Sequence, residues 1–132
     1  MTFRYLIDTD WAIHYLNGNP AIVSRLEELH PQGIGISVIS VAELYEGVLY
    51  SKDPVGNEED LRDLLRGVAV IGIDEATCRI FGQERGRLRA ARKLIGDFDL
   101  LIGATAVRHD VVLLSGNRRH FEAIEGLKLL SE

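Results

Sequence analysis

Four carboxylates that lie far apart in the chain each stand where a parallel α/β fold would end a strand or begin a helix. Asp8 follows the apolar run FRYLI, Glu43 stands in SVISVAELYEG, and Asp97 and Asp99 open DFDLLIGATA. Acidic side chains beside apolar runs are costly to bury unless something offsets their repulsion, and a divalent cation does so. Because hard oxygen ligands favour Mg²⁺ or Mn²⁺ over zinc, the four positions predict a metal-dependent enzyme acting on phosphate esters.

Each carboxylate also has a purely structural interpretation. Asp8 could cap a helix, and Glu43 has the capping-box spacing from Ser40. Asp97 and Asp99 both suit a helix N-terminus, which favours negative charge; of the two, we expect Asp99 to face the site. The positions argue for a site mainly in combination, because they predict three or four oxygen ligands at one edge of one sheet.

Neutral and basic side chains are predicted near the same edge. They are Thr9, Ser115, Asn117, Arg118 and Arg119. The run VVLL ends just before Ser115, so in a parallel sheet its carboxyl end would lie beside Asp8. We take Asn117 as a catalytic candidate and the other four as weaker candidates for substrate contact, although SGN also fits an ordinary turn.

The elements that must position these residues alternate between short apolar runs and longer helical stretches. Strands are predicted at 3–7, 34–38, 68–73, 111–114 and about 127–130. Helices are expected after Asp8, from Pro20, after Ser40, from about 57, from Asp74 to about 92, at 99–109 and around Phe121. The fully apolar run at 68–73 is typical of a central parallel strand. This order predicts a single α/β domain over 1–132, with a central parallel sheet flanked by helices.

The overall composition bounds the class of protein. The 132 residues are 46% hydrophobic, enough for a core, and the net charge of -5 gives no overall positive field for nucleic acid. The single cysteine, Cys78, excludes an internal disulfide and a cysteine-based zinc site. The sequence has no apolar leader and no stretch of the ~18 apolar residues that a membrane span needs. We therefore expect a soluble, cytoplasmic protein with no membrane partner.

The basic residues are concentrated in one stretch despite the negative total. Six Arg or Lys residues lie between 79 and 93. Such a cluster suits contact with RNA phosphates, although a solvated helix face has the same composition. The four histidines have no metal-ligand spacing, and only His120 is expected near the site.

Four segments together resemble the PIN-domain ribonucleases, and specifically the VapC-type toxins of type II toxin–antitoxin systems. They are LIDTD with Asp8, SVISVAELYEG with Glu43, DFDLLIGATAV with Asp99, and LLSGNRRHFEAI with Asn117. The segments span the chain in the order found in that family. The third is the most specific, with its Asp-Leu-Leu-Ile core followed by a strand and the Asn117-to-Phe121 element.

The resemblance implies a Mg²⁺ or Mn²⁺ site formed by Asp8, Glu43 and Asp99, with Asp97 as a further candidate ligand. It implies RNA as the substrate, hydrolysed by a metal-activated water. It also implies a homodimer and a cognate VapB-type antitoxin whose tail enters the acidic groove, with DNA contacted only through the antitoxin. The family often places an acid near Asn117, and here the amide would contact water or ligand.

Two other functions stay open. Asp8 within the sequence IDTD resembles the opening motif of haloacid-dehalogenase phosphatases, in which the first aspartate is a covalent nucleophile. That chemistry needs a lysine near the site, and the chain offers only Lys52, Lys93 and Lys128. The second alternative is a PIN domain that binds RNA without cutting it.

Overall fold

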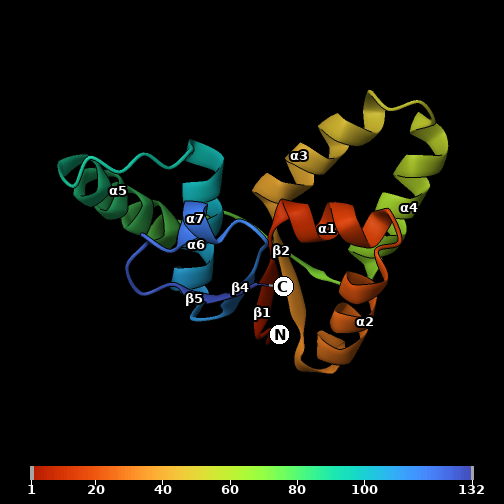
Figure 1. Ribbon diagram of the computed structural model, residues 1–132, viewed down its shortest axis with the longest axis horizontal. Helices are drawn as coiled ribbons and strands as arrows, with labels where there is room; N and C mark the ends of the chain where they lie inside the picture. Colours follow the sequence, from red (N-terminus) through yellow and green to blue (C-terminus); the bar gives the residue numbers. More distant parts are fainter. Residues whose placement is uncertain (1, 132) are drawn as a thin grey trace.

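A computed structural model describes residues 2–131 and shows one parallel sheet between two layers of helices (Figure 1). The strands are β1 (Tyr5–Ile7), β2 (Ile34–Ser37), β3 (Ala69–Ile71), β4 (Val112–Leu114) and β5 (Lys128–Leu130). The helices are α1 (Thr9–Leu16), α2 (Pro20–Leu29), the 3-10 helix η1 (His30–Gln32), α3 (Val38–Leu49), α4 (Pro54–Arg66), α5 (Glu75–Ala90), α6 (Asp97–His109) and α7 (Arg118–Phe121). Within residues 2–131, no helix is long and apolar enough to cross a membrane.

The sheet has the strand order β3-β2-β1-β4-β5, and all four pairings are parallel. The chain moves outward from β1 to β3 and then returns to build β4 and β5 on the other side of β1. The strand order therefore reverses between β1 and β4. In open parallel sheets, ligands bind beyond the carboxyl ends of the strands at this reversal, which we call the switch point. The predicted α/β fold is confirmed.

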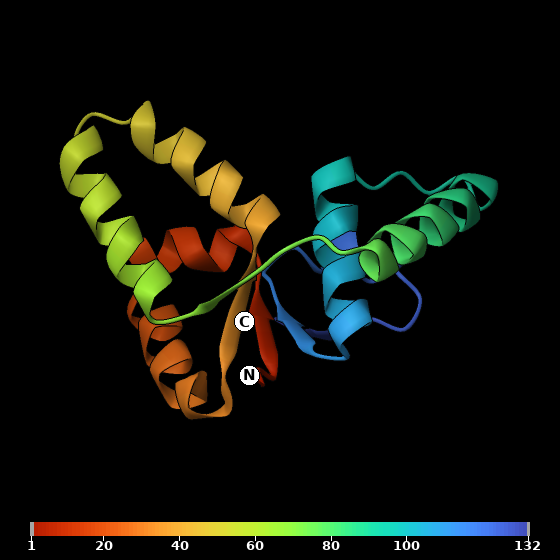
Figure 2. The same cartoon turned by 180° about the vertical axis from the view of Figure 1, so that it is seen from behind.

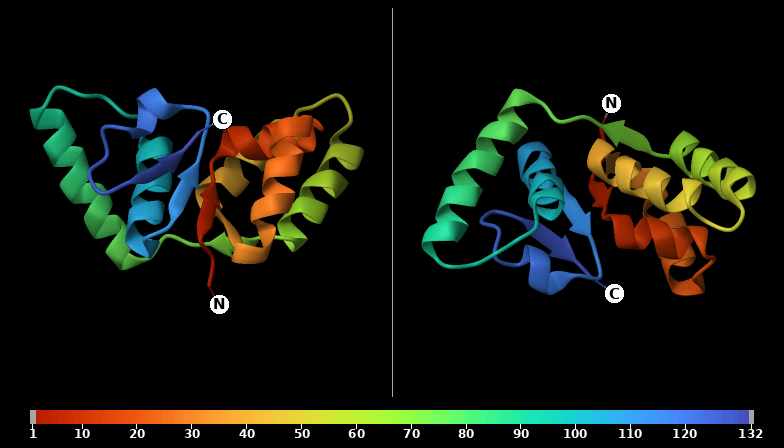
Figure 3. Two further views of the ribbon diagram at one scale, coloured as in Figure 1. Left: turned by 60° about the horizontal axis from the view of Figure 1, so that its bottom comes forward. Right: turned by 90° about the horizontal axis from the view of Figure 1, so that it is seen from above.

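Neighbouring residues on the central strands face opposite helix layers. Leu6 and Leu113 pack with α5, α6 and α7, whereas Ile7 and Leu114 pack with α1 to α4. This alternation follows from the two-residue period of a strand. Figure 2 shows the segment after β3 crossing from one layer to the other, and Figure 3 shows both layers from two further directions.

Side-chain caps fix where several helices begin. Asn19 caps α2 just before Pro20, and the Asp74 carboxylate accepts a 2.8 Å hydrogen bond from the Thr77 amide, as predicted for the start of α5. Asp53 caps α4, and Pro54 occupies its first turn, where a missing amide hydrogen costs nothing. α4 therefore begins three residues before the predicted start near 57.

The predicted central position of residues 68–73 is wrong. β3 pairs only with β2, so it is an edge strand, and Val70 is 49% exposed. Val68 packs with the layer of α1 to α4, and Ile71 packs with the layer of α5 to α7. The apolar run thus reflects contact with two helix layers and not with two neighbouring strands.

Two glycines in the interior of α5, Gly82 and Gly86, allow a test of how helix propensity affects stability. At Gly82 and Gly86 an added Cβ would meet no atom within 4 Å. Because alanine favours the helix and loses less backbone freedom on folding, each change to alanine should raise the free energy of unfolding by about 0.5–1 kcal/mol in urea denaturation. Gly33→Ala is the opposite control, since Gly33 has φ +92° and its Cβ would lie 2.7 Å from the Thr2 carbonyl oxygen. A loss of stability in both α5 variants would contradict the prediction.

Candidate active site

Asp8 lies at the switch point and is held by groups from the end of β4 and the start of α1. Its backbone amide donates to the Leu114 carbonyl oxygen at 2.9 Å. One carboxylate oxygen accepts from the Ser115 hydroxyl at 2.8 Å, and the other accepts from the Thr9 amide at 2.8 Å. With a side chain that is only 3% exposed, Asp8 is a buried carboxylate at the carboxyl end of β1, where the sequence places it.

The environment of Asp8 disfavours its charged form. Burial is the largest cause and raises the pKa of this carboxyl to about 7, while the hydrogen bonds from Ser115 and Thr9 oppose the rise. The negative charges of Asp10 and Asp99 raise the pKa further. Two further carboxylates thus act on Asp8, so a cation at this position would offset both its desolvation and the repulsion.

Glu43 reaches the site from the second turn of α3. The Thr9 hydroxyl oxygen lies 2.6 Å from a Glu43 carboxylate oxygen and 2.9 Å from the Ser40 hydroxyl oxygen. Because a carboxylate only accepts, Thr9 donates to Glu43, which leaves Ser40 to donate to Thr9. Thr9 therefore orients Glu43 beside Asp8, with no basic side chain involved.

The expectation that Ser40 caps the helix is wrong. α3 begins at Val38, and its cap is Ser37, whose hydroxyl accepts from the Ile39 amide at 3.1 Å. Ser40 is buried inside the first turn. The capping-box explanation of Glu43 therefore fails, because the residue three positions before it is not a cap.

The structure separates the two aspartates of α6. Asp99 accepts a 2.9 Å hydrogen bond from His120 Nδ1 and acts on the pKa of Asp8. Asp97, whose side chain is 77% exposed, pairs with Arg85 of α5. Thr9 thus links Glu43 to Asp8, and Asp99 lies close enough to Asp8 to act on its pKa, whereas Asp97 is engaged by Arg85.

Ser115 connects Asn117 to the same site. The Asn117 backbone amide donates to the Ser115 hydroxyl oxygen at 2.9 Å, and that hydroxyl in turn donates to Asp8. The Asn117 side chain does not cap α7 and is exposed. Arg118 and Arg119 follow on the exposed start of α7, where the Arg118 guanidinium lies 3.3 Å from the Ser131 hydroxyl.

Sequence reasoning assigned no site role to Asp10. One Asp10 oxygen accepts from the Gly116 amide at 2.9 Å, and the other accepts from the Trp11 amide at 2.8 Å. Asp10 thus ties the start of α1 to the segment after β4. The sequence did contain a signal for Asp10. Asp8 and Asp10 flank the start of a helix that directly follows a strand, so both must lie at the same edge of the sheet.

The donor set fits a metal ion that the substrate helps to hold. Among residues 2–131, no three His, Cys, Asp or Glu side chains come together as a complete metal site. Mg²⁺ nevertheless keeps several waters in most proteins and needs only one or two carboxylates together with substrate phosphates. Asp8, Glu43 and Asp99 supply oxygens of the right type for that arrangement, so the residues fit Mg²⁺ or Mn²⁺.

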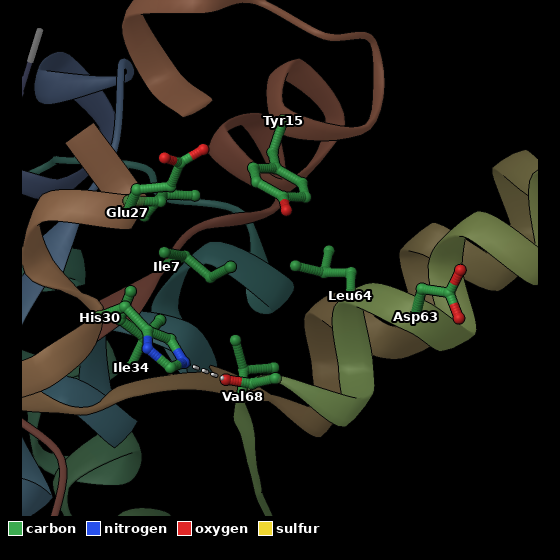
Figure 4. A pocket seen from close by; sticks show the side chains of 10 residues that line it. Ile7, Tyr15, Glu27, His30, Ile34, Asp63, Leu64 and Val68 are labelled. Carbon is green, nitrogen blue, oxygen red and sulfur yellow. Dashed lines mark hydrogen bonds between the residues drawn. The ribbon is translucent and has the colours of Figure 1, made fainter. Parts of the chain in front are cut away.

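A separate pocket of about 280 Å³ opens among α2, α4 and the sheet (Figure 4). His30 Nε2 donates to the Gly67 carbonyl oxygen at 3.1 Å, and Figure 4 marks this bond from the His30 ring with a dashed line. Ile34 and Val68 lie at the opposite edge of the sheet from Asp8, beside the starts of β2 and β3. This pocket is therefore not part of the candidate active site.

The pKa of Asp8 predicts how stability responds to pH without metal. Since the folded-state pKa of about 7 lies above the ordinary value of 3.8, the unfolded chain releases this proton first as pH rises. Ionisation of Asp8 should therefore lower the free energy of unfolding between about pH 4 and pH 7. Asp8→Asn should remove that loss and exceed wild type by about 1–3 kcal/mol at pH 8, measured by urea denaturation in EDTA.

Asp97→Asn is the matched control, because its exposed side chain makes only a surface ion pair. Its effect should stay within about 1 kcal/mol. A stability difference between Asp8→Asn and wild type that does not grow with pH would show that Asp8 is an ordinary capping carboxylate.

Comparison with known proteins places these observations in a family. The PIN domain matches residues 5–127. The chain is 31% identical over 126 residues to Ribonuclease VapC2 of Haemophilus influenzae, with 95% of both chains covered. It is 26% identical over 125 residues to the tRNA(fMet)-specific endonuclease VapC of Shigella flexneri, again with 95% of each covered.

A solved structure agrees with the sequence match. The crystal structure of VapBC2 from Rickettsia felis bound to a DNA fragment from their promoter contains a chain with TM-score 0.92 and 29% identity, and the match covers 97% of this chain and 98% of that chain. The family match extends over most of the sequence, including every carboxylate described above. This protein therefore belongs to the PIN domain family.

Proposed function

We propose that this PIN domain is a metal-dependent endoribonuclease and the toxin of a toxin–antitoxin pair. The observation that carries the proposal is the buried Asp8 carboxylate, whose charged form is disfavoured by burial and by Asp10 and Asp99. A neutral capping residue would serve the fold without this repulsion. A divalent cation, in contrast, binds where carboxylates lie close together. The names of the Haemophilus and Shigella relatives, both nucleases acting on RNA, support RNA as the substrate class.

The side chains divide into ligands and groups that hold the ligands. Asp8, Glu43 and Asp99 would hold Mg²⁺ or Mn²⁺, which when bound would polarise the scissile phosphate and lower the pKa of a water. Thr9 fixes the Glu43 carboxylate by the hydrogen bond described above. His120 does the same for Asp99.

Other residues are proposed to contact the RNA. The exposed amide of Asn117 offers a neutral hydrogen-bonding group beside the ligands. Arg118 and Arg119, both exposed at the start of α7, supply positive charge for a phosphate next to the cleaved bond.

The positions of the three lysines argue against the phosphatase alternative, which needs a lysine near Asp8. Lys128 pairs with Asp110 beside the start of β4, at the opposite edge of the sheet from Asp8. Lys52 follows α3, and Lys93 follows α5. The PIN domain match supports the nuclease over the phosphatase. On the family resemblance, water and not Asp8 would attack the phosphate.

A protein partner is proposed from the relatives. The Rickettsia structure is of a VapBC2 complex on promoter DNA. By this likeness, a VapB-type antitoxin would neutralise the chain, and DNA would be contacted only through the antitoxin. A homodimer is proposed on the family resemblance alone.

An RNA cleavage assay tests the activity. Purified chain freed of any partner should cut bacterial total RNA in Mg²⁺ or Mn²⁺ and not in EDTA. Asp99→Asn should lower the cleavage rate by about 100-fold or more, because it removes a ligand that stabilises developing charge. Asp97→Asn, two residues away and paired with Arg85, should stay within about threefold of wild type, since it removes only a surface ion pair.

Three outcomes would change the assignment. Cleavage that persists in EDTA would exclude metal dependence. Equal losses in Asp97→Asn and Asp99→Asn would contradict the separation of the two aspartates. RNA binding without cleavage in either metal would favour the non-catalytic PIN domain.

Metal binding itself has a readout that does not depend on activity. Mg²⁺ at about ten times its Kd should stabilise the folded chain by about 1.4 kcal/mol, because only the folded state assembles the ligands. The gain should be present at pH 8 and largely absent at pH 5, where Asp8 with a pKa of about 7 is protonated. The measurement is thermal unfolding with and without Mg²⁺ at both pH values. An equal gain at both would place the ion away from Asp8.

A further inference from the structure

Charge is divided unequally between the two halves of the chain. Residues 1–74 contain 5 Lys or Arg and 12 Asp or Glu. Residues 75–132 contain 10 Lys or Arg and 8 Asp or Glu. The first half builds the layer of α1 to α4, and the second half builds the layer of α5 to α7. The candidate active site at the switch point therefore has an acidic layer on one side and a more basic layer on the other.

Not all cations in the basic stretch are available to a partner. Arg85 pairs with Asp97, and Arg87 pairs with Glu84. The remaining four are exposed and form no ion pair with any carboxylate in residues 2–131. We call these four the α5 cation surface: Arg79, Arg89, Arg92 and Lys93.

The C-terminal end of this surface has a defined structure. The Arg92 amide donates to the Arg89 carbonyl oxygen at 3.0 Å, and the Lys93 amide donates to the Leu88 carbonyl oxygen at 2.8 Å, which closes the end of α5. Arg85 then donates to the Ile95 carbonyl oxygen at 2.9 Å, which fixes the following segment against α5. The cations thus stand on ordered backbone.

The same segment leads directly into the candidate active site. Residues 91–96 connect α5 to the start of α6, whose first turn carries Asp99 (Figures 1 and 2). Arg79 and Arg89 are ten residues apart on one helix, so the surface extends about 15 Å along α5. That length exceeds what one phosphate at the cleaved bond would occupy.

We propose that the α5 cation surface binds the phosphate backbone of the RNA away from the cleaved bond, so that the RNA lies across α5 and not across α3 and α4. The inference rests on the proposed nuclease function and adds where the RNA lies. Four unpaired cations attract a polyanion, while the acidic layer of α1 to α4 repels it. Arginine and lysine on phosphates position a nucleic acid without reading its sequence, so binding here is independent of sequence.

The test compares two triple variants with the same change in net charge. Arg89→Gln/Arg92→Gln/Lys93→Gln removes three cations of the α5 cation surface. Lys52→Gln/Arg62→Gln/Arg66→Gln removes three exposed cations from α4 and the loop before it. Binding of a fluorescein-labelled 30-nucleotide single-stranded RNA is followed by anisotropy in EDTA, which prevents metal-dependent cleavage, over a range of KCl concentrations.

The α5 variant should bind this RNA at least about tenfold more weakly than wild type near 0.1 M salt. The slope of the logarithm of the binding constant against the logarithm of the salt concentration should be smaller in magnitude by about 2. The control variant should stay within about threefold with an unchanged slope, since its cations lie on the acidic layer, where Arg62 pairs with Glu58 and Arg66 pairs with Asp63. Circular dichroism and urea denaturation confirm that both variants are folded.

Several results would overturn the inference. Equal losses in both variants would show that only net charge matters, and no loss in the α5 variant would show that the RNA lies elsewhere. Absence of RNA binding by wild type at about 0.05 M salt would also reject it. A parallel titration with poly-L-glutamate covers an acidic protein partner: loss of that binding with RNA binding unchanged would assign the surface to such a partner instead. Failure of the proposed nuclease is a separate result, since it appears as absent cleavage in Mg²⁺ and Mn²⁺.

Discussion

The structure around the switch point depends on keeping one carboxylate buried where its charge is disfavoured. Asp8 is held by the Ser115 hydroxyl from the end of β4 and by the Thr9 amide from the start of α1. The Ser115 oxygen also accepts from the Asn117 amide, so one hydroxyl fixes the carboxylate and the turn that follows β4. A shift of β4 relative to β1 would leave a buried polar group without its partner, which costs more than the hydrogen bond contributes.

The carboxylates outside the candidate active site and those inside it are held by different kinds of partner. Asp74, Glu84 and Asp97 each pair with an arginine. Within residues 2–131, Asp8 and Glu43 pair with no lysine or arginine, and they are held by hydroxyl and amide donors instead. Neutral donors fix the position of an acid without cancelling its charge, so the charge stays available to an added cation.

Much of this arrangement could be predicted from the sequence, because strand ends and apolar periodicity locate Asp8, Ser115 and the starts of α1, α2 and α5. The predictions that were wrong concerned positions that look equivalent in the local sequence. Ser37 and Ser40 both precede apolar helical residues, and only packing decides that Ser37 caps α3 while Ser40 contacts Thr9. The edge position of β3 was also hidden, because partial burial against two helix layers gives the same apolar run as burial between strands.

The two aspartates of α6 show a further limit of sequence reasoning. Asp97 and Asp99 share a helix turn and a residue type, so local pattern ranks them only weakly. Their different partners are remote in sequence, because Arg85 bonds to Asp97 while His120 bonds to Asp99. The same α5 residue that neutralises Asp97 also bonds to the Ile95 backbone. Residues two apart on a helix point in different directions, so Asp97 and Asp99 meet different partners, and the Arg85 guanidinium that pairs with Asp97 also fixes the segment between α5 and α6.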